Sequence, residues 1–287
     1  MTESARITGC GFIDPTGWGD HLVQNTWPAG ATVCPDRLAW RLFSESPFDR
    51  FGRLDMVSQY AVVAAEMSLR SRTDTSDDEE TAIVLTTAGS LAADLEFLAS
   101  MGAPGGASPT AFSYTLPSTA IAEVAIRYHM KGPSLCLPKP PHLPEIGLRE
   151  GLRLVCRQEA RRCLCLVADA IPTCAMPLLP ADHRGGLADH YAYAFLIEGG
   201  SPPRTAVSTG IADMRVEARQ QVIRAETSPH RAGGVASQLC RFLLAADPRD
   251  QMDIAFPAVS STPEVLVITK AADTISRNAG ATNGSIC

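Results

Sequence analysis

The sequence lacks long apolar runs and an excess of positive charge, and both absences narrow the classes of protein to which it can belong. Of its 287 residues, 45% are hydrophobic and 20% are charged, and no window approaches the roughly eighteen apolar residues that a membrane-spanning helix needs. The formal net charge of -6 provides no basic face for nucleic acid. We therefore predict a globular protein with no membrane span and no nucleic-acid partner.

The N-terminal segment lacks both the basic and the apolar region of a secretory signal. Its early arginine, Arg6, is followed almost at once by a short alternating pattern that is typical of a strand. We therefore expect a cytoplasmic location.

Cysteine is frequent but lacks the spacing of a disulfide framework or of a zinc site. The nine cysteines are scattered and odd in number, which in a chain without an export signal indicates reduced thiols that pack as small core residues. Cys163 and Cys165 alternate with Leu164 and Leu166 as residues of a strand do, and no pair has the spacing of zinc ligands. We expect no metal and no cofactor.

A locally basic segment, Arg149–Arg162, alternates its charges with apolar residues at helical spacing. This pattern is typical of a helix with one solvated face. The alternative interpretation is a weak docking surface for an acidic carrier protein.

Strand and helix patterns alternate along the chain. The run at 81–87 is continuous and β-branched, which is typical of a strand buried on both faces. Strands are expected at 6–13, 81–87, 162–170, 190–200 and 206–210, helices at 56–70, 91–100, 119–130, 144–157 and 233–246, and two short strands within 253–269. This order predicts an α/β fold with a covered central sheet. Residues 271–287 lack periodicity and are expected to form a disordered tail.

Four segments, in order, resemble the β-ketoacyl synthase family. They are 48–69, the strand and helix at 81–98, Ser108–Ser134, and 180–198 with its Asp-x-Arg-Gly turn. The third is similar to the family's long dimer-facing helix, which ends in Gly-Pro-Ser. The resemblance covers about 6–211 and implies a thiolase-like, layered α/β/α fold whose N-terminal half, 1–211, is largely complete.

The family's catalytic cysteine has no counterpart at the place where the resemblance would put it. In the family, that cysteine follows the Ser of Gly-Pro-Ser by about seven residues and takes the acyl chain, aided by two histidines. Counting from Ser134 puts Pro141 there, and aligning on the following helix puts Lys139 there. Neither side chain can form a thioester, and the surrounding prolines remove backbone N–H groups that an oxyanion site would need. The nearby Cys136 alternates with leucines and is expected to be a buried core residue. The alternative interpretation of Cys136 is a catalytic nucleophile.

The family's second half is expected to be reduced in this chain. Its His-Gly-Thr-Gly-Thr motif is absent, while Ser228–Pro248 faintly resembles the helix that begins at the second active-site histidine, with His230 in that position. His230 is then either a vestige of the site or a residue at the entry of a helix. Residues 212–270 are expected to form a remnant, a helix and a strand hairpin packed on the same domain.

The resemblance implies a non-catalytic subunit similar to a chain-length factor, which pairs with a catalytic ketosynthase in polyketide or fatty-acid elongation. Short proteins of this kind resemble those of aryl-polyene and related bacterial pathways. The expected interface residues are Phe112, Tyr114, Leu116 and Pro117. The partners would be a ketosynthase or a second copy of this chain, and an acyl carrier protein.

Two other functions stay open at this point. One is an acyltransferase or decarboxylase with another nucleophile, such as Cys136 or Cys174, although no base and orienting group accompany either thiol at a readable spacing. The other is a module that binds an acyl chain or its carrier without a ketosynthase partner.

Overall fold

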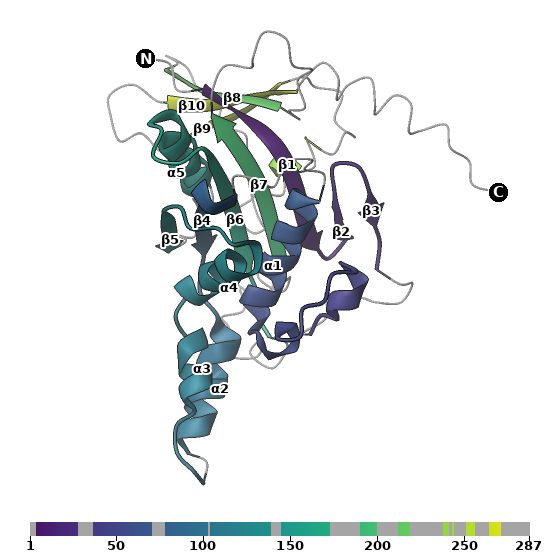
Figure 1. Ribbon diagram of the computed structural model, residues 1–287, viewed down its shortest axis with the longest axis vertical. Helices are drawn as coiled ribbons and strands as arrows, with labels where there is room; N and C mark the ends of the chain where they lie inside the picture. Colours follow the sequence, from purple (N-terminus) through teal and green to yellow (C-terminus); the bar gives the residue numbers. More distant parts are fainter. Residues whose placement is uncertain are drawn as a thin grey trace, which may run out of the picture.

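The computed structural model describes residues 4–27, 37–70, 78–102, 104–138, 145–172, 190–199, 212–218, 238–240, 243, 251–255 and 264–270. Within these residues a single mixed sheet forms the centre of the protein (Figure 1). Its strands are β1 (Ser4–Asp14), β2 (Gly17–Asp20), β3 (Gln24–Asn25), β4 (Thr81–Thr87), β5 (Ser134–Pro138), β6 (Arg162–Asp169), β7 (Tyr191–Gly199), β8 (Ala212–Ala218), β9 (Gln251–Ala255) and β10 (Glu264–Lys270).

The strand order along the sheet is β5-β4-β6-β7-β1-β8-β10-β9, with β2 and β3 attached beside β1. Strands β5, β4 and β6 are parallel, whereas β7 is antiparallel to both β6 and β1. The carboxyl ends of the three parallel strands therefore lie at the same end of the sheet. Among the described strands, β5 is an edge strand.

The two faces of the sheet are buried in two separate apolar clusters. In β4, Ala82 and Val84 belong to one cluster, and Ile83 and Leu85 belong to the other. Every residue of β4 is buried, because its continuous β-branched run places apolar side chains on both faces.

Helices cover both faces of the sheet, as expected for a layered α/β/α fold. Helix α1 (Met56–Leu69) and helix α4 (Ser118–Tyr128) supply one cluster. Helix α5 (Glu145–Cys156) and the helical residues 238–240 and 243 supply the other. Asp55 begins α1 by accepting hydrogen bonds from Val57 and Ser58 N–H.

Two glycines of β1 permit α1 to lie directly on that strand. A Cβ at Gly9 would lie 2.2 Å from Ser68 O, and one at Gly11 would lie 2.3 Å from Ala64 O. Any side chain at these positions would push the helix off the sheet.

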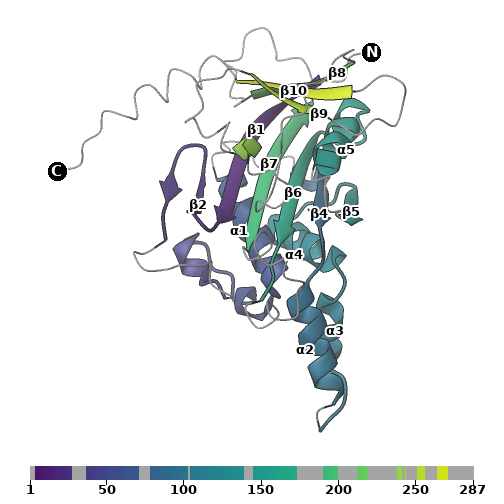
Figure 2. The same cartoon turned by 180° about the vertical axis from the view of Figure 1, so that it is seen from behind.

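Helices α2 (Leu91–Met101) and α3 (Pro109–Tyr114) form a two-helix hairpin. Figures 1 and 2 show this hairpin projecting from the end of the molecule nearest α4. We call residues 91–114 the arm. Short 3-10 turns complete the described fold: η1 (Trp40–Leu42), η2 (Phe51–Arg53) and η3 (Asp78–Glu80).

Most of the expected elements are confirmed, among them the helix expected at 119–130, which is α4. Helix α3, which precedes it, is not among the elements that the sequence predicts. Strands β2, β3 and β8 are not among the elements that the sequence predicts. The strand expected at 206–210 and the tail at 271–287 lie outside the described residues. Across the described ranges, no helix is long and apolar enough to cross a membrane.

Candidate functional site

The carboxyl ends of β4, β5 and β6 lie together at one end of the sheet. Open α/β sheets carry their ligand-binding sites at this end of their strands. Pro138 ends β5 opposite Thr87 of β4, and the family's nucleophile would follow β5 at this point. Lys139 and Pro141, the two candidates for the altered nucleophile position, lie outside the described residues, as does His230.

Cys136 lies in the middle of β5, opposite Leu85 of β4. Its side chain packs against the α1 face of the sheet but is only partly buried. The expected buried core thiol is thus found packed on the core but only partly buried, because among the described strands β5 has a neighbour on one side only. Burial raises the pKa of the Cys136 thiol, which lowers the thiolate fraction at neutral pH and disfavours a role as nucleophile.

A buried carboxylate, Asp169, joins the ends of β4, β6 and β7. Its Oδ1 accepts hydrogen bonds from the Ala88 N–H at 2.7 Å and from Thr87 Oγ1 at 3.4 Å. Its Oδ2 accepts one from the hydroxyl of Tyr191, which faces it across the β6–β7 pair. Asp169 is not among the residues that the sequence singles out, although an aspartate ending an otherwise apolar strand is a signal that could have found it.

His190 precedes β7 and is also buried. Its Nδ1 accepts a hydrogen bond from the Ile171 N–H at 3.2 Å, and its ring lies edge-on to Tyr60 with centroids 5.6 Å apart. In the neutral ring the proton is then on Nε2. This hydrogen bond links the residues that follow β6 to the residue that precedes β7, so His190 stabilises the connection between the two strands.

The four expected interface residues lie at the base of the arm, where α3 leads into α4. Phe112 and Leu116 are each 51% exposed, and Pro117 is also exposed. Tyr114 turns the other way: its hydroxyl donates to Glu123 Oε1 of α4 at 3.3 Å. Burial, and then the charge of Glu123, raises the pKa of Tyr114.

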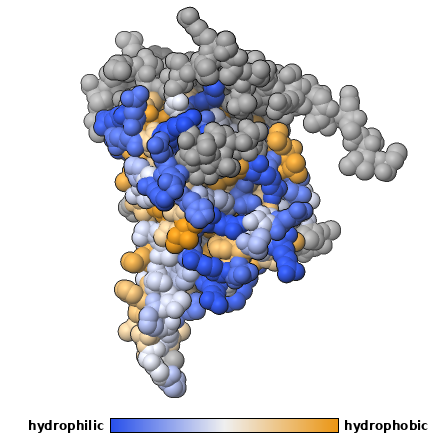
Figure 3. Space-filling model, in the orientation of Figure 1, coloured by the Kyte–Doolittle hydropathy of each residue, from blue (hydrophilic) through white to orange (hydrophobic). Residues whose placement is uncertain are grey.

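Exposed apolar side chains continue from this base onto the arm and onto α4. The large exposed ones are Leu98, Met101, Phe112, Leu116 and Ile126. Figure 3 shows apolar surface along one edge of the arm. Nearby, β5 offers an open strand edge in the described part of the chain, since it pairs only with β4 there.

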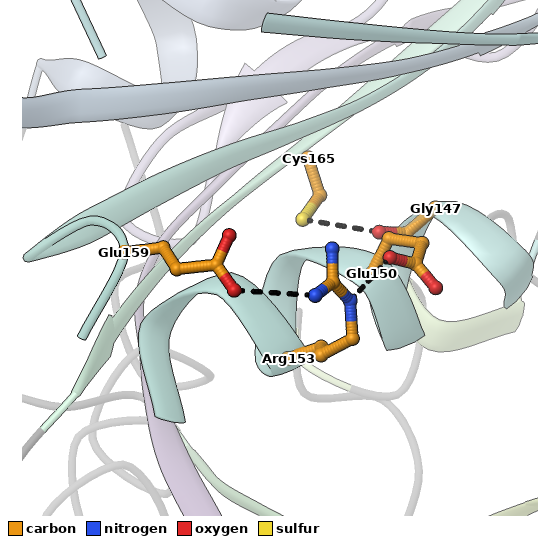
Figure 4. Close-up of polar contacts among 5 residues, drawn as sticks. All are labelled: Gly147, Glu150, Arg153, Glu159 and Cys165. Carbon is orange, nitrogen blue, oxygen red and sulfur yellow. Dashed lines mark hydrogen bonds and ion pairs between the residues drawn. The ribbon is translucent and has the colours of Figure 1, made fainter. Parts of the chain in front are cut away.

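Helix α5 carries the first part of the basic segment, and two arginines of that segment form ion pairs. Arg153 forms ion pairs with Glu150 at 2.7 Å and with Glu159 at 3.3 Å (Figure 4). Arg162 is buried and pairs with Glu198 at 2.8 Å. The expectation of an amphipathic helix is confirmed. Both glutamates of the segment 149–162 pair with Arg153, so the segment keeps an excess of positive charge, and the alternative of a weak carrier-docking face stays a prediction.

Among the described residues, no group of three or more His, Cys, Asp and Glu side chains could hold a metal ion.

The comparisons with known proteins identify the fold. No family model matches the sequence, and no sequence of the curated proteins matches it either. Among solved structures, the ishigamide ketosynthase/chain length factor matches with a TM-score of 0.65 and 16% identity, over 94% of this chain and 100% of that chain.

Two further structures give the same picture. A ketosynthase in complex with its chain length factor from Xenorhabdus doucetiae has a TM-score of 0.59 and 15% identity, over 93% of this chain and 99% of that one. The structure of a type II polyketide synthase acyl-carrier protein in complex with its ketosynthase bound to the hexaketide matches with a TM-score of 0.66 and 14% identity. The match covers 94% of this chain and 100% of that chain. The chain thus has the fold of ketosynthase and chain length factor structures over most of its length.

Proposed function

We propose that this chain is a non-catalytic, chain-length-factor-like subunit that pairs with a catalytic β-ketoacyl synthase in polyketide or fatty-acid elongation, of which an aryl-polyene pathway is one form. The observation that carries the proposal is the edge of β5, which is open in the described part of the chain and lies in contact with α4, the helix that bears the exposed Ile126. Two of the similar structures are named as ketosynthase–chain length factor proteins.

The open edge is suited to a partner strand. Pro133 O accepts the Ile83 N–H at 2.9 Å, and backbone groups point to alternate sides along a strand. The backbone groups of Ser134 and Cys136 therefore point away from β4. An edge of this kind pairs readily with a strand of another chain, and Phe112, Leu116 and Ile126 add apolar area to the same contact.

The chemistry of the thiol supports a subunit without catalysis. Cys136 sits two residues before the end of β5, and burial raises its pKa. The positions that would replace the nucleophile are Lys139 and Pro141, which cannot carry an acyl chain. Condensation is then performed by the partner, and an acyl carrier protein delivers its substrate to the assembled pair.

The division of the chain follows from the same proposal. Residues 1–211 form the ketosynthase-like half, and 212–270 form a reduced second half with His230 as a vestige. The described strands β8, β10 and β9 extend the same sheet beyond β1, which supports their packing on one domain.

The test is co-expression with the ketosynthase encoded nearest to the gene of this chain, followed by size-exclusion chromatography. We expect a heterodimer with the native sequence. The variant Cys136→Pro removes the N–H that points away from β4 and leaves the β4 ladder in place, so we expect it to abolish the heterodimer.

The matched control is Cys136→Val, which keeps the backbone N–H and should still assemble. Circular dichroism checks that both variants are folded. If the native chain elutes only as a monomer or homodimer, the proposal is overturned. Covalent labelling of a cysteine of this chain by an acyl-chain electrophile such as cerulenin would instead favour the enzyme alternative.

A further inference from the structure

The arm contacts the apolar core of the protein only near its two ends, where Ala92 and Tyr114 pack partly buried against the cluster on the α1 face. Each of its helices has one buried residue, Ala93 in α2 and Ala111 in α3. The two helices mainly hold each other: the rings of Phe97 and Phe112 lie 5.3 Å apart, and Ser108 N–H donates to Ser100 Oγ at 3.0 Å. Beyond the residues at its two ends, core packing does not hold the arm.

Polar contacts of a buried carboxylate hold the first joint, where β4 leads into α2. Asp169 accepts both the Ala88 N–H and the Thr87 hydroxyl, and Thr87 Oγ1 in turn accepts the Gly89 N–H at 3.1 Å. Gly89 has a φ of 103°, a conformation that favours glycine. The next residue, Ser90, begins α2, so the turn held by Asp169 sets the start of the arm.

A second buried carboxylate holds the other joint, where α3 leads into α4. Glu123 is 7% exposed. Its Oε1 accepts the Tyr114 hydroxyl from the last residue of α3, and its Oε2 pairs with Arg50 of the body. The two ends of the arm thus depend on two carboxylates that both lie inside the protein.

We propose that Asp169 and Glu123 are the positioning residues of the arm: they fix the angle at which its exposed side chains Leu98, Met101 and Phe112 meet a partner. The proposal rests on the function proposed above. It extends that function, because it assigns the geometry of recognition to two carboxylates that do not touch the partner.

Physical chemistry favours this assignment. A buried hydrogen-bond donor that loses its acceptor is left unsatisfied, which costs free energy. A weakly packed element lowers this cost by opening locally, so that water reaches the donor. Removing Asp169 orphans the Ala88 N–H and the Thr87 hydroxyl at one joint. Removing Glu123 orphans the Tyr114 hydroxyl and Arg50 at the other.

Hydrogen exchange of the full chain without a partner measures how strongly the backbone amides of the arm are protected. In Asp169→Ala and in Glu123→Ala we expect amides of 91–114 to exchange at least about tenfold faster than in the native chain, while β6 and β7 keep their protection. Glu123→Gln keeps an acceptor for Tyr114 and should restore most of the protection.

Tyr191→Phe is the matched control. It removes the Asp169 partner that comes from the sheet and leaves both arm donors in place. We expect it to lower the melting temperature without a selective change in exchange at 91–114.

Affinity for the ketosynthase is the second readout. We expect the two alanine variants to bind about tenfold more weakly, corresponding to about 1.4 kcal/mol, with Tyr191→Phe close to the native chain. Uniformly faster exchange across arm and sheet would overturn the proposal, as would native affinity in both alanine variants. If the native chain binds no ketosynthase while the arm alone loosens in the variants, the proposed function fails and the positioning role stands.

Discussion

Asp55 is a single residue in which capping and burial act against each other. Its carboxylate accepts the Val57 and Ser58 N–H groups, each at 3.2 Å, and begins α1. These bonds favour the charged form. Loss of solvent is nevertheless the larger effect, and it raises the pKa of Asp55 above the ordinary value of 3.8.

We predict that Asp55→Asn flattens the dependence of stability on pH. The pKa of Asp55 is higher in the folded state than in the unfolded state, so the folded state holds this proton more tightly. Its contribution is present at low pH and is lost as pH rises through the folded pKa. Asparagine keeps the cap without the charge. Urea unfolding between about pH 4 and about pH 7 should show the native chain losing more stability than the variant across this interval; equal losses would contradict the prediction.

Single residues also show what the sequence could not disclose. The alternation of Cys136 with leucines predicts a buried thiol, but burial depends on neighbouring strands, and the position of β5 at the end of the sheet is a tertiary fact. Asp169 acts through donors on β4 and β7 that are 22 or more residues away in the sequence. Local pattern carries no information on such pairings.

Elements were predictable wherever a local pattern was strong. The β-branched run of β4 and the apolar spacing of α1 predict the strand and the helix correctly because both patterns reflect burial in a layered fold. Helix α3 is not predicted, because its six residues are too few to show a helical period. The short strands β2 and β3 have too few residues to show a period.

The contact between α1 and β1 allows a prediction at the scale of elements. In Gly11→Ala the new Cβ would lie 2.3 Å from Ala64 O and 2.4 Å from Ser68 N, so helix and strand must separate. We expect a loss of about 1–3 kcal/mol in the free energy of unfolding, measured by urea denaturation. Gly52→Ala is the matched control, because a Cβ at that position would have no other atom within 4 Å. A Gly11→Ala protein as stable as the control would show that the helix does not rest on the strand.

At the scale of the whole molecule, the large exposed apolar side chains gather mainly on the arm and the adjoining α4, and Leu22, Val23 and Leu42 lie elsewhere. Helix α5 presents charged side chains, among which Arg153 pairs with Glu150 of the same helix. The arm, α4 and the edge of β5 present apolar side chains and open backbone groups. A partner therefore gains most on the side of the arm.

We predict that the partner stabilises this chain by mass action. A ketosynthase that binds only the folded chain should raise its melting temperature progressively with concentration, by an amount equivalent to about 2.7 kcal/mol at a concentration of 100 times Kd. Differential scanning calorimetry of the chain with increasing amounts of the ketosynthase measures this shift. Cys136→Pro should show none, and Cys136→Val should follow the native chain. A melting temperature independent of the ketosynthase would contradict the prediction.

The open edge of β5 has a consequence for how cells must supply this protein. Under the proposed pairing, a copy made in excess lacks the partner strand at that edge, and identical copies can then stack edge to edge into aggregates or be removed by proteases. Synthesis of the two subunits in matched amounts, close together in time, keeps the unassembled pool small. The abundance of this chain should therefore follow that of its partner more closely than that of its own messenger RNA.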